Sequence, residues 1–154
     1  MKPSLLISIT AALLVGAIVA AAPLAAPSSP AQRAAIQTLP GFRSPSGNIK
    51  CFVAKALYCS INRAGYTKQL QDRCIARTGL DWHGFKLAGT RARVYCTSNP
   101  PYDMGKQRPS NAKLAYGKTF RHAGFTCTSR VTGVTCRNGA GHALFISRQA
   151  WRAS

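Results

Sequence analysis

The sequence predicts a mainly β fold: a small disulfide-bonded domain of short antiparallel strands and hairpins, barrel-like or sandwich-like, with at most one short helix. Three observations lead to this prediction. The 154 residues are 46% apolar, which suffices for one moderate core. Short segments alternate polar and apolar residues with the period of two that strands have. Six cysteines supply covalent links between such segments.

The N-terminus has the form of a signal peptide. Met1, Lys2 and Pro3 precede an apolar run over residues 5–21, and small residues end that run. We expect residues 1–21 to be the signal, with cleavage after Ala21. The alternative is an apolar segment that is kept as a membrane anchor, since its length just suffices to span a bilayer.

The next segment has the composition of a tether. Residues 22–38 are mostly Ala, Pro, Ser and Gln, which bury too little apolar surface to order themselves. We therefore expect a flexible linker over 22–38 and a single disulfide-stabilised β domain over 39–154.

Two pairs of cysteines bracket predicted hairpins. Cys51 and Cys59 enclose FVAKALY, and Cys127 and Cys136 enclose TSRVTGVT. An exported chain with an even cysteine count is first a disulfide framework, although six cysteines allow many connectivities. If each of these pairs is bonded across its own hairpin, Cys74 and Cys96 remain to bond with each other. The expected bridges are Cys51–Cys59, Cys74–Cys96 and Cys127–Cys136.

The remaining elements follow from local patterns. Thr67 to Arg77 is the only plausible helix, and a hairpin is expected from Phe85 to Thr97 around Gly89-Thr90. Ala143 to Ser147 reads as a last strand, and Ser98 to Asn111 as a long polar loop. In Ser44-Pro45-Ser46-Gly47-Asn48, proline fixes one φ and the last two residues tolerate a positive φ, which predicts a turn.

Several of these segments together resemble a known family. They are Phe42-Arg43-Ser44-Pro45-Ser46-Gly47-Asn48-Ile49-x-Cys51, Ala115-Tyr116-Gly117, Gly124 to Ser129, Gly133 to Asn138, Gly141-His142 and Ser147-Arg148. In this order around the cysteines they resemble a family of exported bacterial proteins, domain of unknown function 6636, over roughly Phe42 to Arg148. The resemblance implies a small exported disulfide-bonded domain, and it brings no activity, substrate or catalytic residue.

Charge is the strongest physical feature of the chain. Twenty-one Lys and Arg stand against three Asp and Glu, a formal net charge of +18. Such a field attracts cell-wall polymers, lipid head groups or nucleic acid, with an affinity that falls with salt. The alternative is a well-solvated basic surface without a partner. The candidate binding residues are Arg91, Arg93, Arg121, Arg130, Arg137 and Arg148.

Catalysis has few candidate groups. The chain has no Glu and only three Asp, which supplies paired-carboxylate hydrolysis and hard-cation sites poorly. No cysteine pair has C-x-x-C spacing, so no metal site and no cofactor are expected. His122 and His142, with Lys113 or Lys118, are weak candidates for an RNase-like site. The plainer interpretation of His142 is a turn histidine.

The predicted function is that of an uncharacterised exported protein, periplasmic or secreted. The main hypothesis is a non-catalytic basic module that binds an anionic polymer or the cell envelope, without a stable membrane span once the signal is cleaved. The alternatives are a small secreted RNase-like hydrolase that uses His122 and His142, or an envelope inhibitor or structural protein. The sequence leaves the oligomeric state open.

Overall fold

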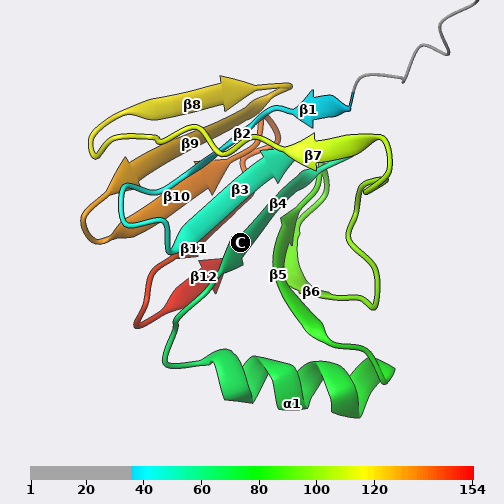
Figure 1. Ribbon diagram of the computed structural model, residues 1–154. Helices are drawn as coiled ribbons and strands as arrows, with labels where there is room; N and C mark the ends of the chain where they lie inside the picture. Colours follow the sequence, from blue (N-terminus) through cyan, green and yellow to red (C-terminus); the bar gives the residue numbers. More distant parts are fainter. Residues whose placement is uncertain (1–35) are drawn as a thin grey trace, which may run out of the picture. The chain divides into compact units, whose positions relative to one another are not determined.

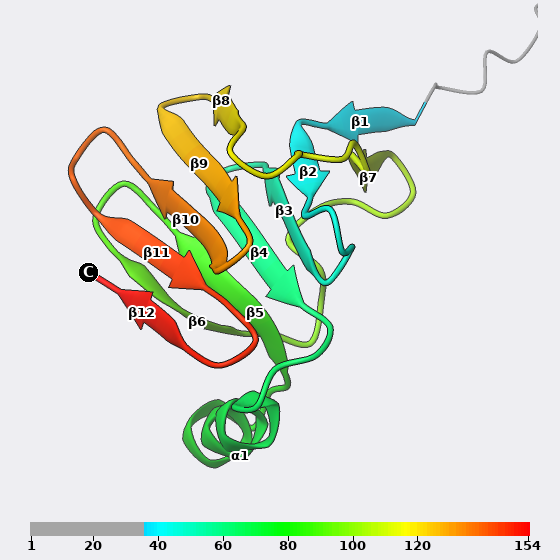
Figure 2. The same ribbon diagram turned by 90° about the vertical axis from the view of Figure 1, so that its left-hand side faces the viewer.

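The computed structural model describes residues 36–154 as two five-stranded antiparallel sheets, one short helix and a small parallel pair of strands. Figures 1 and 2 show the two sheets as separate layers. The predicted signal peptide and most of the predicted linker lie outside the described residues. In the part of the chain that is described, no helix is long and apolar enough to cross a membrane.

The N-terminal sheet has the strand order β2-β3-β4-β5-β6. Its strands are β2 (Gly41–Arg43), β3 (Ile49–Val53), β4 (Leu57–Ile61), β5 (Trp82–Leu87) and β6 (Ala92–Cys96). Consecutive strands pair throughout, as in a meander, because each connection except that between β4 and β5 is a short turn.

The C-terminal sheet is a second meander with the order β12-β11-β10-β9-β8. Its strands are β8 (Thr119–His122), β9 (Phe125–Arg130), β10 (Gly133–Arg137), β11 (Ala143–Ile146) and β12 (Trp151–Ala153). The hairpin predicted around TSRVTGVT is β9–β10, and Gly133 has the expected positive φ, at 143°.

The core lies between the two sheets, which makes the domain sandwich-like rather than a closed barrel. Phe42 and Phe85 of the first sheet and Val134 and Leu144 of the second are each at most 2% exposed and share one cluster. Aromatic contacts also cross the interface: the rings of Phe85 and Trp151 lie 5.2 Å apart. Alternation along each strand thus leaves one face of each sheet for the outside.

The three disulfides are Cys51–Cys59, Cys74–Cys96 and Cys127–Cys136, the pairs expected from the hairpins. Two of them join directly opposed residues of neighbouring strands, one in each sheet. They meet in the core, where the Sγ atoms of Cys51, Cys59 and Cys136 all lie within 4.8 Å of one another. The third bridge fastens the helix to β6.

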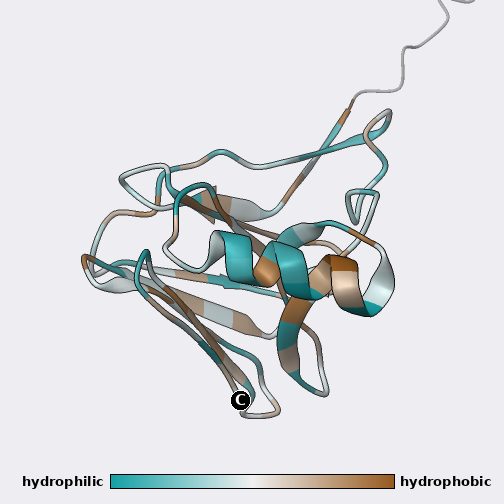
Figure 3. Ribbon diagram, turned by 90° about the horizontal axis from the view of Figure 1, so that it is seen from below, coloured by the Kyte–Doolittle hydropathy of each residue, from teal (hydrophilic) through white to brown (hydrophobic). Residues whose placement is uncertain are grey.

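Helix α1 (Thr67–Thr78) ends one residue beyond the predicted span. Gly79 follows it as the C-cap, in a left-handed conformation. It buries only Leu70 and Cys74, and Figure 3 shows mostly hydrophilic residues along the rest of it. With so narrow an apolar face, the Cys74–Cys96 bridge is an essential part of its attachment.

Five short strands within residues 36–154 were not predicted from the sequence. β1 (Gln37–Leu39) begins inside the predicted 22–38 linker and pairs in parallel with β7 (Gln107–Pro109), which lies inside the predicted 98–111 loop. β2, β8 and β12 were not assigned either. Each has only three or four residues, too few for an alternating pattern to be read.

Candidate anion-binding site

The predicted turn at Ser44–Asn48 joins β2 to β3 and is fixed by its own hydrogen bonds. The Ser44 hydroxyl accepts from the backbone N–H of Ile49 at 3.1 Å, and the Ser44 carbonyl accepts from Gly47 N–H at 2.8 Å. Gly47 has φ 72°, a conformation that glycine adopts without strain. These hydrogen bonds define the conformation of the turn beside β3.

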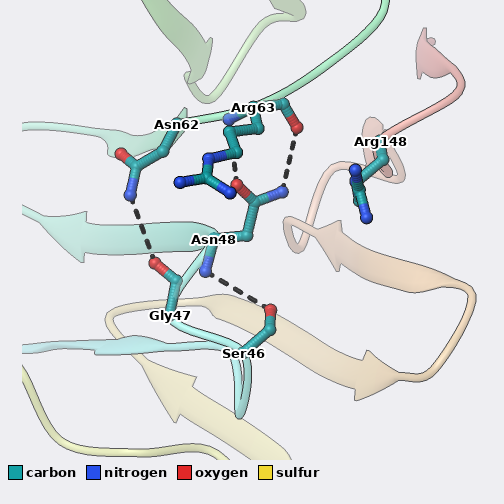
Figure 4. Close-up of a pocket in the computed structure, with 6 residues that line it drawn as sticks. All are labelled: Ser46, Gly47, Asn48, Asn62, Arg63 and Arg148. Carbon is teal, nitrogen blue, oxygen red and sulfur yellow. Dashed lines mark hydrogen bonds between the residues drawn. The ribbon is translucent and has the colours of Figure 1, made fainter.

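Asn48 connects this turn to the segment after β4. Its Oδ1 accepts from the backbone N–H of Arg63 at 2.9 Å, and its Nδ2 donates to the Arg63 carbonyl at 3.0 Å. Figure 4 shows these bonds, with the Arg63 and Arg148 side chains on either side of Asn48. Because Asn48 uses both ends of its amide on the backbone, it positions Arg63 and leaves the guanidinium available.

Arg148 lies in the turn between β11 and β12, and the segment just before α1 holds this turn through hydrogen bonds. The buried Tyr66 hydroxyl donates to the Ser147 carbonyl at 2.8 Å, and Gly65 N–H donates to the Arg148 carbonyl at 2.9 Å. The Ser147 hydroxyl accepts from Ala150 N–H at 3.0 Å and closes the turn locally. The backbone of Arg148 is thus fixed while its side chain is exposed.

Burial raises the pKa of Tyr66 from 10.0 to about 12. The unfolded chain ionises this phenol at lower pH, so the stability that neutral Tyr66 provides is complete below pH 10 and is lost as the pH rises to about 12. Tyr66→Phe should remove this alkaline dependence and lower the free energy of unfolding at pH 7 by about 1 kcal/mol, the usual value of one hydrogen bond.

Absorbance titration of the tyrosines and urea unfolding at several pH values check this prediction. The late-titrating part of the wild-type curve should lose one tyrosine in Tyr66→Phe. An unchanged titration curve in the variant would contradict the assignment.

Three arginines surround the hollows beside the turn. Two adjoining hollows of about 360 and 350 Å³ share Ser46, Asn48 and Arg148. Arg63 lines the first and Arg130 the second. We call the two together the turn pocket. Arginine guanidinium groups beside hydroxyls and turn amides form the kind of surface that binds phosphate, sulfate or carboxylate.

The turn-pocket arginines have no internal counter-charge among residues 36–154. The carboxylates of Asp72 and Asp103 lie near Lys68 and Lys106, and Asp81 accepts from Gln71. No guanidinium of the turn pocket donates a hydrogen bond or pairs with a carboxylate in that part of the chain. Their charge is therefore free to meet an external anion.

The six predicted binding arginines, all of them exposed, fall into three groups. Arg130 and Arg148 line the turn pocket. Arg121 and Arg137 lie on the outer face of the C-terminal sheet, both in register with Thr126 of β9, the strand between them. Arg91 and Arg93 belong to the edge strand β6 of the other sheet or the turn before it, so they do not join the first two groups.

The outer face of the C-terminal sheet carries threonines between its arginines. Arg121 Nη1 donates to Thr126 Oγ1 at 3.2 Å, and the Thr119 and Thr128 hydroxyls are 3.2 Å apart. Arg152 lies over the Phe145 ring at 5.3 Å. We call this surface the hairpin face, made of Thr119, Arg121, Thr126, Thr128, Thr135, Arg137, Phe145 and Arg152.

The structure does not bring the two candidate histidines together. His122 ends β8 and His142 precedes β11, with β9 and β10 between them. At about 4.8 Å a strand, their backbones are about 14 Å apart. His142 closes a turn, since its N–H donates to Asn138 Oδ1 at 2.9 Å.

The cluster of Cys51, Cys59 and Cys136 has ligand atoms at metal-binding distances, but all three are bonded in disulfides. A cysteine binds metal as a thiolate, so the cluster has no ligand to offer in this state.

A model for a family of unknown function (DUF6636) matches residues 17–152 of the chain. The chain belongs to this family. No curated protein and no solved structure matches the chain. The family match includes the segments that carry the resemblance, and the fold brings two of them, Ser44–Asn48 and Ser147–Arg148, together at the turn pocket.

Sequence reasoning missed Arg63 as part of the turn pocket. Arg63 is 15 residues from Asn48 and follows no motif, and only the β3–β4 hairpin register brings it to the turn. Ser46 and Asn48 were predicted as turn residues alone, because turn chemistry and ligand chemistry use the same residue types.

Proposed function

We propose that this domain is a non-catalytic module that binds an anionic polymer through the turn pocket and the hairpin face. The observation that carries the proposal is the set of exposed arginines without internal carboxylate partners around these two surfaces. Each anionic group that replaces a counter-ion there releases that ion, which makes binding favourable and sensitive to salt.

Arg130 links the two surfaces into one track. It ends β9 beside the turn pocket, and Thr126 and Thr128 precede it on the outer face of the same strand. Four residues of strand cover about 13 Å, so Arg121 and Arg137 lie roughly that far from Arg130 along the sheet. A linear polymer with repeated charges fits this spacing better than a single small anion does.

Localisation belongs to the same proposal. Three disulfides suit an oxidising compartment, and the N-terminal pattern suits export, so the proposed site of action is the periplasm or the outside of the cell. The polymer would then be a cell-wall polymer, an anionic lipid surface or extracellular nucleic acid. No observation favours the RNase-like alternative, since its two histidines are separated by two strands.

The test compares two double variants that lose the same charge. Arg137→Ala with Arg148→Ala removes one arginine from each proposed surface, whereas Arg73→Ala with Arg77→Ala removes two exposed arginines of α1. Fluorescence anisotropy with labelled heparin and with a labelled DNA duplex is measured from low to physiological salt. The first variant should bind at least about ten-fold more weakly, with the slope of log K against log salt reduced by about two for the duplex.

The helix variant should retain most of the wild-type affinity, because only its long-range field changes. Equal losses in the two variants would mean that net charge alone attracts the polymer, and would overturn the proposed surface. Absence of binding to either probe at low salt would overturn the proposed function itself.

A further inference from the structure

A second feature lies on the outer face of the other sheet, where aromatic side chains stand side by side. The Phe52 and Tyr58 rings stack at 5.6 Å, Tyr95 meets Tyr58 edge-on at 5.1 Å, and Tyr102 meets Phe52 edge-on at 5.3 Å. Phe52 and Tyr58 are opposed on β3 and β4, and Tyr102 comes from the loop before β7. Three strands and one loop therefore supply one aromatic surface.

Basic groups border this aromatic surface. Lys86 is opposed to Tyr58 and to Arg93 in the sheet, and its Nζ lies 5.5 Å from the centre of the Tyr58 ring. Burial raises the pKa of Tyr58, against a smaller lowering by the positive charge of Arg93. Lys50 lies on β3 at the opposite side of the surface and lines a hollow there.

The surface is hollowed on both sides of Tyr102. Hollows of about 340 and 180 Å³ share Phe52, Ser60 and Tyr102 as walls. Lys50 and Asn111 also line the larger hollow. The smaller hollow is completed by Tyr58, Cys59, His83, Tyr95, Pro100 and Pro101. We call the two together the aromatic hollow.

Four hydroxyl groups in the aromatic hollow have no hydrogen-bond partner among residues 36–154. The hydroxyls of Tyr58, Tyr95, Tyr102 and Ser60 neither donate nor accept a hydrogen bond there. Tyr58 is only 7% exposed, but its hydroxyl still reaches solvent, since Ser129 Oγ is the only buried side-chain polar atom without a partner in the described part of the chain. Open aromatic walls with unused hydroxyls and amines indicate a ligand that combines rings, polar edges and negative charge.

We propose that the aromatic hollow binds bases of a single-stranded nucleic acid, with its phosphates on Lys50, Lys86 and Arg93. Aromatic side chains stack on any base, and a basic border follows the backbone, which gives binding without sequence preference. Duplex DNA does not fit, because its bases are not available to the rings. This proposal is independent of the hairpin face, which belongs to the other sheet, and of the turn pocket, which shares no lining residue with the aromatic hollow.

The experiment separates base stacking from charge. Binding of a fluorescein-labelled oligothymidine is compared with that of an abasic strand with the same number of phosphates. The wild type should bind the oligothymidine at least about five-fold more tightly. Tyr102→Ala should abolish this preference, and Tyr102→Phe should retain it because the phenyl ring still stacks.

Arg73→Ala with Arg77→Ala is the matched control, since these exposed helix arginines lie outside all the proposed surfaces and their loss should leave the preference for bases unchanged. Urea unfolding of each Tyr102 variant verifies that the domain is folded, and Tyr95→Ala provides a second removal of a ring from the same hollow. Equal affinities of the wild type for the two strands would overturn the proposal. So would an unchanged base preference in the folded Tyr102→Ala and Tyr95→Ala variants, and so would competition by a neutral oligosaccharide at the concentration that the oligothymidine requires.

Discussion

Gly84→Ala is expected to abolish the cooperative folding of the domain or to lower its free energy of unfolding by about 4 kcal/mol or more. A Cβ at this position would overlap the backbone carbonyl of Cys59 and lie 3.0 Å from the Ser60 Cα atom. Gly84 also has φ 118°, a conformation that residues with a Cβ rarely adopt. Both costs arise because β5 contains an irregularity in its pairing at Trp82–Gly84.

Urea unfolding followed by circular dichroism measures this loss. Gly89→Ala is the matched control, since Gly89 lies in the β5–β6 turn and a Cβ there meets nothing within 4 Å. The control should change the free energy of unfolding by less than about 0.5 kcal/mol. A Gly84→Ala protein as stable as the control would mean that β4 and β5 are not as close as the structure has them.

The sequence predicted those parts of the fold that depend on neighbouring residues. The β3–β4 and β9–β10 hairpins could be recognised because each arm has several alternating residues and a cysteine at a matched position. The disulfides followed from the hairpins, since two directly opposed pairs leave a single remaining pair. The parallel pairing of β1 with β7 could not be predicted, because 70 residues separate Gln37 from Gln107.

The candidate site shows the same division. Arg130 and Arg148 were predicted from charge near the C-terminal hairpin, and they line one pocket with the predicted turn. Arg91 and Arg93 carried the same prediction, yet strand order places them at the edge of the other sheet, where Arg93 borders the aromatic hollow. Charge composition identifies exposed arginines well, whereas only the order of the strands decides which of them act together.

Reduction of all three disulfides is expected to unfold the domain, and the Cys74–Cys96 bridge should be reduced first. Cys51, Cys59, Cys127 and Cys136 are at most 2% exposed between the sheets, whereas Cys96 is only half-buried at the end of the edge strand β6. Dithiothreitol in native buffer should therefore open Cys74–Cys96 and release α1, while the core bridges wait for unfolding.

The bonded cysteines are separated by 8 residues in Cys51–Cys59, 22 in Cys74–Cys96 and 9 in Cys127–Cys136. In the chain-entropy account, each such bridge contributes about 3 kcal/mol of stability. Together they are comparable with the whole free energy of unfolding of a typical domain, about 5–15 kcal/mol.

Alkylation of freed thiols and mass spectrometry over time give the order of reduction, and circular dichroism gives the loss of sheet. Because the Cys136 Sγ lies within 4.8 Å of Cys51 and Cys59, partial reduction in urea should also yield mixed bridges between the sheets. Simultaneous reduction of all three bridges in native buffer would contradict the packing of the two core disulfides, since it would require the sandwich to open as easily as the edge of β6.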